Sequence, residues 1–286
     1  MSPSRAATEA LNRVLRPFNM RLDSMTVARR EAARIEEAAR RGDFDRPLYA
    51  VPPSFDGNDW RDVLRSTADY GDRFLSFRDP RQNDVGYDFA NGYFSSPDAE
   101  VLYTIVRTKR PARILEIGCG NSTKIIRQAI RDGSFECHHR CIDPYPREEI
   151  SQLADVVIRR KIENFDPAEL ASGLTAGDIL FIDTSHEVSP ANDVAYIYGR
   201  LLPRINTGVV VHIHDIFLPY EYPVRWVKEL GLDWGEQYVV HAMLLGDQWK
   251  VLWPGYYLQR SVPNFADQFP ANNGRDAQSL WICRKE

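Results

Sequence analysis

The chain has 286 residues, of which 43% are hydrophobic and 27% are charged, and its net charge is −4. This composition indicates a globular protein with one large α/β domain and an extension, or with two small domains. A mildly acidic chain is a poor candidate for binding nucleic acid through a basic surface, and the sequence contains no apolar stretch of the ~18 residues that a membrane-spanning helix needs.

The first 90 residues are predicted to form a helical arm and cap. Apolar residues recur at helical spacing between Leu11 and Phe18. Residues 26–41 are rich in Ala, Glu and Arg, which favour helix formation. Such an arm can pack on its own domain or on a second subunit, so the sequence is compatible with a homodimer. We predict a domain boundary after residue 90, with residues 91–286 forming the second domain.

Beyond this boundary, helical segments alternate with short apolar runs. Residues 96–110 are predicted to form a helix that Ser96 caps and that ends before Pro111. Several later runs are apolar on both faces, which is typical of buried parallel strands. An open α/β sheet of this kind binds ligands at the carboxyl ends of its strands. The predicted strands contain the runs RILEIG, HHRCID, DVVIRRK, DILFID, GVVVHIHD, WKVLW and SLWICRK.

The first of these runs ends in an acid beside two glycines, in the stretch EIGCGNST. Gly118 and Gly120 allow a tight turn and a close backbone approach to a ligand. Asp143 ends the second run, 23 residues after Gly120, where a carboxylate can accept both hydroxyls of a ribose. The alternative is a glycine turn that only joins a strand to a helix.

The same stretch distinguishes between two adenosine cofactors. A dinucleotide fingerprint has a third glycine, and Thr123 occupies that position here. Glu116 adds a negative charge that opposes a pyrophosphate but suits the sulfonium and ammonium groups of S-adenosylmethionine. The charges therefore favour S-adenosylmethionine, and a nicotinamide-dependent oxidoreductase is the alternative from another class of enzyme.

Four blocks of the sequence resemble the class I S-adenosylmethionine-dependent methyltransferases: ILEIGCGNST, CIDPYP, GDILFIDTSHEVSPANDV and GVVVHIHDIFLPYEYP. The last two blocks resemble a branch that includes metal-dependent bacterial sugar O-methyltransferases. The resemblance implies a Rossmann-like, seven-stranded, mostly parallel sheet whose last strand is antiparallel. It also implies that residues 91–286 form the methyltransferase domain and that the helical arm is an extension of it.

The resemblance assigns cofactor contacts along the carboxyl edge of the sheet. It implies that Glu116 and the two glycines lie beside the methionine part of the cofactor. Asp143 is then expected at the ribose and Glu163 near the adenine. The predicted cofactor-binding residues are Glu116, Gly118, Gly120, Asn121, Ser122, Asp143, Glu163 and Asp183.

The resemblance also implies a metal site and a base. Asp183, His214 and Asp215 occupy the positions of the Mg²⁺ ligands, and His186, with Asp183, is the expected catalytic pair. His214 stands where the relatives have an acid. Mg²⁺ prefers oxygen ligands, whereas an imidazole favours Mn²⁺, Fe²⁺ or Zn²⁺. Either the metal differs, or His214 is not a ligand, or there is no metal.

The remaining histidines are predicted to have structural roles. His212 lies within a strand and is expected to be a hydrogen-bonded core residue. His241 lies among apolar residues of a helix and is expected to pack there. His138 and His139 lie at the start of the second strand and are expected at the surface.

These features predict an O-methyltransferase that acts on a hydroxyl of a sugar or glycan precursor, with assistance from Mg²⁺, Mn²⁺ or Fe²⁺. A metal-independent methyltransferase of a phenolic or other small metabolite is the alternative, and a cofactor-binding protein without catalysis is a further one. The four cysteines form no Cys-x-x-Cys pair. We therefore expect reduced thiols and a cytoplasmic protein.

Overall fold

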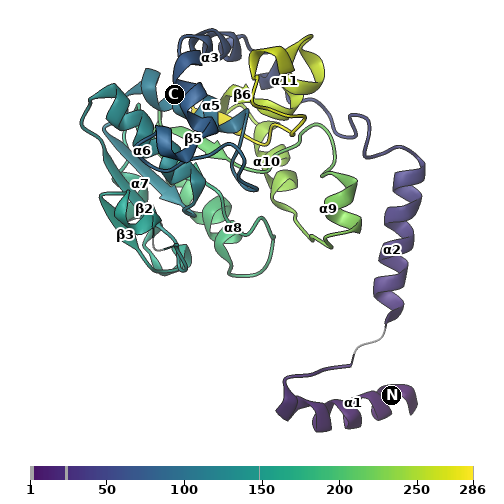
Figure 1. Ribbon diagram of the computed structural model, residues 1–286. Coiled ribbons are helices and arrows are strands. Elements are labelled where there is room, and N and C mark those ends of the chain that lie inside the picture. The colour runs from purple at the N-terminus through teal and green to yellow at the C-terminus, as the bar shows by residue number, and fades with distance from the viewer. Residues whose placement is uncertain (1–2, 23–24, 148, 286) are drawn as a thin grey trace. The chain divides into compact units, whose positions relative to one another are not determined.

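The computed structural model describes residues 3–22, 25–147 and 149–285, which fall into two compact units (Figure 1). The smaller unit combines residues up to 46 with residues 223–232, and the larger unit contains the rest of the chain. Residues 47–90 thus belong to the same compact unit as the sheet. The functional division predicted after residue 90 stays a prediction.

The smaller unit is built from short helices. The two helices predicted near the N-terminus are present, and Lys228 forms an ion pair of 2.5 Å with Glu36. None of the helices in the described parts of the chain is both long and apolar enough to cross a membrane. The helices of this unit are α1 (Pro3–Leu15), η1 (Arg16–Phe18), α2 (Met25–Arg40) and α9 (Val224–Lys228).

The larger unit contains a seven-stranded sheet, as predicted. The strand order is β3-β2-β1-β4-β5-β7-β6. Strands β1 to β5 are parallel, and β7 runs antiparallel to both β5 and β6. The strands are β1 (Arg113–Ile117), β2 (His138–Ile142), β3 (Val156–Ile158), β4 (Ile179–Ile182), β5 (Val210–Ile213), β6 (Trp249–Pro254) and β7 (Leu280–Arg284).

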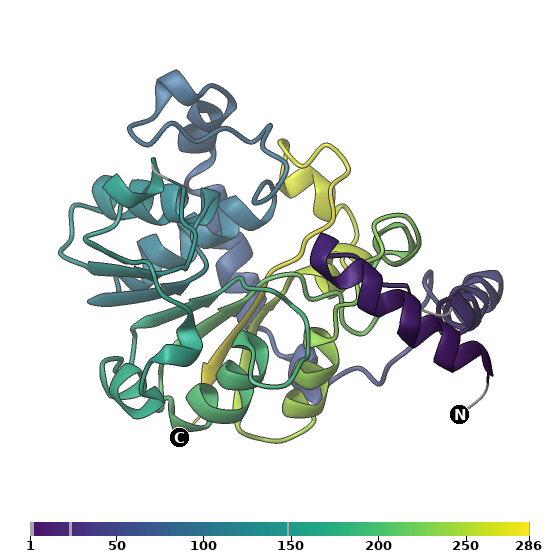
Figure 2. The ribbon, with the colours of Figure 1, turned by 90° about the horizontal axis from the view of Figure 1, so that it is seen from below.

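Helices cover both faces of this sheet (Figures 1 and 2). Because side chains alternate along a strand, Leu115 and Ile117 pack with α7, α8 and α10, whereas Ile114 packs with α5 and α6 on the other face. The helices of this unit are α3 (Asp59–Ala68), α4 (Gly71–Leu75), α5 (Asp98–Lys109), α6 (Asn121–Gly133), α7 (Pro167–Ser172), α8 (Asp193–Tyr196, continued by a π-helical turn over Ile197–Leu201), α10 (Glu236–Leu244) and α11 (Gly255–Ser261).

The start of α5 differs from the prediction. Ser96 does not cap the helix, because its hydroxyl donates to Oε1 of Glu100 at 2.7 Å. The helix begins at Asp98, whose carboxylate accepts the backbone N–H groups of Gln278 and Ser279. The first turn of α5 is thereby fixed to the segment that leads into β7. The helix ends at Lys109, before Pro111 as predicted.

Candidate functional site

The carboxyl ends of four strands, β1, β2, β4 and β5, are joined by backbone hydrogen bonds that continue beyond the strands. The N–H of Gly118 donates to Ile142 at 3.0 Å, that of Asp183 to Ile117 at 3.0 Å, and that of His214 to Ile182 at 3.1 Å. The loops after β1, β4 and β5 therefore start side by side. This pairing brings residues from distant parts of the sequence to one edge, as expected for an open parallel sheet.

Gly118 is required by the close approach of the loops after β1 and β4. Its φ angle is +83°, and a Cβ atom at this position would lie 1.8 Å from the carbonyl oxygen of Asp183. Only glycine fits such a position. Gly120 differs, because a Cβ atom there meets no atom within 4 Å. Its N–H donates to the hydroxyl of Thr123 at 3.2 Å, which fixes the first turn of α6.

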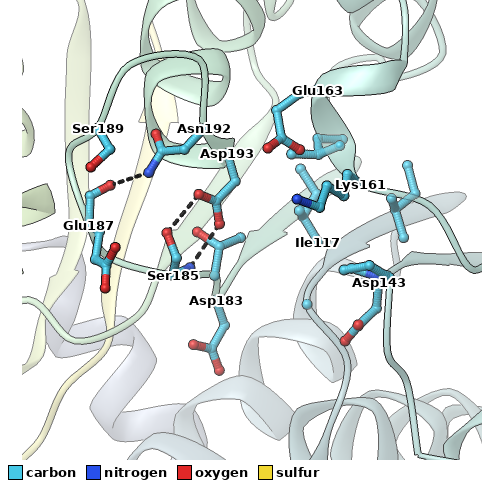
Figure 3. A pocket seen from close by; sticks show the side chains of 15 residues that line it. Ile117, Asp143, Lys161, Glu163, Asp183, Ser185, Glu187, Ser189, Asn192 and Asp193 are labelled. Carbon is cyan, nitrogen blue, oxygen red and sulfur yellow. Dashed lines mark hydrogen bonds between the residues drawn. The ribbon is translucent and has the colours of Figure 1, made fainter. Parts of the chain in front are cut away.

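A cavity of about 440 Å³ opens at this edge of the sheet (Figure 3). Its volume is within the range of small-molecule sites. Of the predicted cofactor-binding residues, Gly118, Asp143, Glu163 and Asp183 line it. Glu116, Gly120, Asn121 and Ser122 are not among the lining residues. The other lining residues are Ile117, Ile142, Pro144, Lys161, Ile162, Thr184, Ser185, Glu187, Ser189, Asn192 and Asp193.

Asp143 is held in a fixed orientation at the wall of the cavity. Its Oδ2 accepts the N–H of Cys119 at 2.9 Å, and its Oδ1 accepts the N–H of Tyr145 at 2.7 Å. Each carboxylate oxygen can accept more than one hydrogen bond. Asp143 can therefore still accept the two hydroxyls of a ribose, as the sequence predicts.

Glu116 lies beneath the glycine loop instead of facing the cavity. Its side chain is fully buried. Its Oε1 accepts the hydroxyl of Ser122 at 2.7 Å, and its Oε2 lies 2.9 Å from the hydroxyl of Thr123, 2.8 Å from Nε2 of His139 and 3.1 Å from the thiol of Cys141. The carboxylate thus ties β1 to β2 and to α6. The prediction that His139 lies at the surface is wrong, since its side chain is fully buried.

A second group of acids and imidazoles lies at the ends of β4 and β5. Nε2 of His186 is 3.3 Å from Oδ1 of Asp183 and 3.2 Å from Oδ2 of Asp215. His186 and Asp215 both have a φ of +58°. Residues other than glycine adopt this backbone conformation at a cost in free energy. Such residues often occur at functional sites. We call Asp183, His186 and Asp215 the acid–imidazole cluster.

His186 is held between carboxylates on both sides of its ring. Its Nδ1 is 2.7 Å from Oε2 of Glu236, a residue of α10 that the sequence did not reveal as part of the site. Burial alone would lower the pKa of His186, but hydrogen bonds and charges from Asp183, Glu236 and Asp215 raise it to about 10. These contacts do not favour the predicted base role, because the carboxylates that face both ring nitrogens stabilise the protonated imidazole.

His214 lies next to the cluster and is also buried. Its Nδ1 is 3.5 Å from Oδ1 of Asp215 and 3.8 Å from Oδ1 of Asp183, and its Nε2 is 3.8 Å from Oδ2 of Asp98. Oδ1 of Asp215 and Nε2 of His214 have no hydrogen-bond partner among the residues that the structure describes. His212 is a core residue, as predicted, because its Nε2 lies 2.9 Å from the hydroxyl of Ser279 and its ring stacks on Phe181.

The acid–imidazole cluster fits a divalent cation. One oxygen or nitrogen from each of its three residues lies within 4.8 Å of the others. The separations of 3.2 and 3.3 Å from Nε2 of His186 are close to those between neighbouring ligands with bonds of ~2.1 Å to one ion. The other carboxylate oxygen of Asp215, Oδ1, is buried and accepts no hydrogen bond from the described residues, so it is a further candidate ligand atom. Asp183 lines the cavity as well, so the two parts of the site share a residue.

Similarity to known proteins bears on what this domain does. Residues 115–216 match the model of a family described as a methyltransferase domain, and no match was found among the curated proteins. Similar solved structures include a methyltransferase from Podospora anserina bound to S-adenosylhomocysteine, with 15% identity, coverage of 93% of this chain and 99% of that chain, and a TM-score of 0.41. A DUF574 family protein from Streptomyces avermitilis has 16% identity, coverage of 66% and 80%, and a TM-score of 0.42. The family match supports methyl transfer as the activity of the part of the chain that contains residues 115–216.

Proposed function

We propose that the chain is an S-adenosylmethionine-dependent O-methyltransferase that acts on a hydroxyl of a sugar or glycan precursor with the help of a divalent cation. One observation carries this proposal. A cavity of the size of a cofactor site adjoins the acid–imidazole cluster, and Asp183 belongs to both. A methyl donor in the cavity would therefore lie next to the groups that can activate an acceptor.

The proposed cofactor contacts rest on the family resemblance, and Gly118, Asp143 and Glu163 among them also line the cavity. Asp143 accepts the ribose hydroxyls, and Glu163 lies near the adenine. The backbone at Gly118 and Gly120 lies beside the methionine part. Asn121 and Ser122 begin α6 next to this loop, and contacts from them stay a prediction. Glu116 acts indirectly in this proposal, because its buried carboxylate holds the loop from below.

The proposed reaction is an in-line displacement at the methyl carbon. The acceptor oxygen forms the new bond to carbon, the sulfur leaves as a neutral thioether, and the hydroxyl proton of the acceptor passes to solvent water. A sugar hydroxyl barely ionises at neutral pH, so it needs activation. A divalent cation would lower the pKa of a bound hydroxyl. Asp183 and Asp215 would hold this cation, and the same carboxylates fix the position of the acceptor.

The acceptor class rests on the resemblance of the blocks around Asp183 and Asp215 to sugar O-methyltransferases. The aromatic residues after β5 do not identify the acceptor. Tyr220 and Tyr222 are buried and pack against neighbouring rings. A phenolic acceptor is therefore an outcome that an experiment has to separate from a saccharide.

Binding and activity measurements test the proposal in sequence. Calorimetry with S-adenosylhomocysteine and with NADH establishes the cofactor, and we expect binding of the former alone. A labelled methyl donor is then offered with sugar nucleotides and with catechols, before and after treatment with a chelator and return of Mg²⁺, Mn²⁺ or Fe²⁺. Absence of S-adenosylhomocysteine binding at millimolar concentration would overturn the whole proposal. Methylation of catechols alone would replace the saccharide by a phenolic acceptor. Full activity after chelation would remove the cation from the proposal.

A further inference from the structure

The start of α10 holds both the main chain and the side chain of His186. The carbonyl oxygen of His186 accepts the N–H groups of Gly235 and Glu236 at 3.0 and 3.1 Å. The ring of Trp234 packs on the imidazole at a centroid distance of 4.4 Å. These contacts keep His186 in its unusual backbone conformation, with φ of +58°.

A buried chain of hydrogen bonds orients the imidazole ring. The hydroxyl of Tyr198 donates to Oε1 of Glu236 at 2.7 Å, and Oε2 of Glu236 lies 2.7 Å from Nδ1 of His186. Glu236 is fully buried and His186 is 4% exposed. Because a carboxylate only accepts hydrogen bonds, Glu236 places a proton on Nδ1 and turns Nε2 toward Asp183 and Asp215.

This arrangement is the one that metal-binding histidines commonly have. A histidine ligand usually donates its other ring N–H to a carboxylate or a carbonyl group, which fixes the tautomer and the direction of the lone pair. Here Glu236 would be that carboxylate, and Tyr198 would orient Glu236 in turn. The sequence assigns a base role to His186 instead, but both of its nitrogens already face carboxylates.

We propose that Glu236 and Tyr198 hold His186 as a nitrogen ligand beside Asp183 and Asp215, and that the site therefore prefers Mn²⁺, Fe²⁺ or Co²⁺ to Mg²⁺. The inference rests on the proposed function, because it concerns the same cation. Glu236 and Tyr198 are positioning residues, since they act through His186. The chemical reason for the preference is that Mg²⁺ favours oxygen ligands, whereas imidazole suits the later transition ions.

The competing explanation is a purely structural ion pair. In that case a protonated His186 only neutralises Asp183, Asp215 and Glu236, and no cation binds between them. Both explanations predict a loss of activity when the cluster is changed, so activity does not separate them. Measurement of cation binding and detection of a nitrogen ligand separate the two explanations.

The experiment uses the full chain after removal of metals with a chelator. Electron paramagnetic resonance of Mn²⁺ gives its affinity, competition gives the affinity for Mg²⁺, and electron spin-echo modulation reports a directly bound ¹⁴N. We expect Mn²⁺ to bind more tightly than Mg²⁺ and to show the ¹⁴N signal. Glu236→Gln should weaken Mn²⁺ binding by about 10–100-fold, and Tyr198→Phe should weaken it less. His186→Gln should remove the ¹⁴N signal and lower the ratio of the affinity for Mn²⁺ to the affinity for Mg²⁺.

A matched control is available in the same unit. Glu221 also accepts hydrogen bonds from two tyrosine hydroxyls, those of Tyr49 and Tyr238, but it lies outside the cluster. Glu221→Gln should therefore leave the affinity for Mn²⁺ unchanged. Calorimetry with S-adenosylhomocysteine on every variant reports whether the cofactor site is intact.

The outcomes separate this inference from the proposed function. Normal binding of S-adenosylhomocysteine without Mn²⁺ binding, or with Mn²⁺ binding that Glu236→Gln does not change, would overturn the inference and leave the cofactor assignment in place. A ¹⁴N signal that survives in His186→Gln would assign the nitrogen ligand to His214 and would also overturn the inference. If Glu236→Gln fails to fold, Tyr198→Phe decides. If the unmodified chain does not bind S-adenosylhomocysteine, the proposed function itself is wrong.

Discussion

Two groups of acids and imidazoles lie on neighbouring strands and the loops that follow them, and they differ in how well their carboxylates are supplied with hydrogen bonds. The carboxylate of Glu116 faces four donor groups, from Ser122, Thr123, His139 and Cys141, at 2.7–3.1 Å. Such a set satisfies a buried carboxylate. Glu116, His139 and Cys141 also lie close enough together to be candidate ligands of an ion, but their hydrogen bonds to one another and to the two hydroxyls already satisfy the carboxylate.

The acid–imidazole cluster has similar residue types but wider spacing. Asp183 and Asp215 lie 3.2–3.3 Å from the same nitrogen of His186, and one oxygen of Asp215 accepts no hydrogen bond from the described residues. An unsatisfied buried carboxylate is costly. The two groups therefore share residue types and differ in how many hydrogen-bond donors face their carboxylates.

Gly118→Ala should disturb the acid–imidazole cluster, because Gly118 lies directly against the main chain of Asp183. Its added Cβ would lie 1.8 Å from the carbonyl oxygen of Asp183, at a φ of +83°. Backbone strain and overpacking each cost ~1–3 kcal/mol, so we expect unfolding in urea to show a loss of about 2–6 kcal/mol. Gly120→Ala is the control, since open space surrounds that position. Equal losses in the two variants would contradict the close approach of Gly118 to Asp183 as the cause.

Asp215→Asn should affect cation binding more than any variant of the Glu116 group. Asparagine removes the negative charge of the oxygen that lacks a donor. Because loss of an outer partner alone costs about 10–100-fold in metal affinity, loss of a ligand should weaken Mn²⁺ binding by more than ~100-fold. Paramagnetic resonance of Mn²⁺ measures this. Unchanged binding of Mn²⁺ in Asp215→Asn would show that the comparison misplaces the ligand site.

Glu100 is a third buried carboxylate and extends the comparison to pH. Ser96 donates to its Oε1, and Oε2 has no hydrogen-bond partner in the described part of the chain. Burial raises the pKa of Glu100 from 4.5 to about 7. Between these two values the folded chain binds a proton that the unfolded chain has lost, so the free energy of unfolding falls as pH rises and levels off above pH ~7.

The size of this fall follows from the shift in the pKa of Glu100. Each pKa unit corresponds to ~1.4 kcal/mol, so this group should remove about 2–3 kcal/mol of stability between pH ~5 and pH ~8. Urea unfolding of the wild type and of Glu100→Gln, both with a chelator present, gives the difference between their pH profiles. Parallel profiles for the two chains would refute the assignment to Glu100.

Glu116→Gln should reduce stability without reducing cation binding. The amide replaces an oxygen acceptor by a donor that faces hydroxyl and thiol donors. An unsatisfied buried polar group costs ~1–3 kcal/mol, and urea unfolding should show a loss of this size. The affinity for Mn²⁺ should remain that of the wild type. A fall in Mn²⁺ affinity as large as that of Asp215→Asn would erase the distinction between the two groups.

The sequence predicted the fold because most of the strands are short apolar runs and helical segments lie between them. It also predicted that Asp143 and Asp183 lie at one edge, since the carboxyl ends of parallel strands converge. The direction of Glu116 was not predictable in the same way. Its side chain is buried because β1 pairs with β2 in a register that sets Glu116 opposite Cys141, and no local pattern specifies that register.

Glu236 was not predictable from the sequence at all. It is separated from His186 by 50 positions, and its own surroundings in the sequence resemble those of any acid in the first turn of a helix. Only the packing of α10 against the loop after β4 brings the two together. Lys161, which lines the cavity, was missed for a similar reason, because a lysine after a short strand carries no signal of its own.

Asp143→Asn should give the smallest effect, because it changes one acceptor in a cavity that has many contacts. Asparagine keeps one oxygen but loses the charge, and a hydrogen bond to a charged group contributes ~1.5–3 kcal/mol. Since asparagine retains part of this, we expect calorimetry to show a loss of about tenfold in affinity for S-adenosylhomocysteine. The 2′-deoxyribose analogue of S-adenosylhomocysteine tests the contact directly. It should bind the wild type more weakly than S-adenosylhomocysteine does, whereas Asp143→Asn should distinguish little between the two ligands, because coupled changes are not additive. Equal discrimination by both chains would place the ribose elsewhere in the cavity.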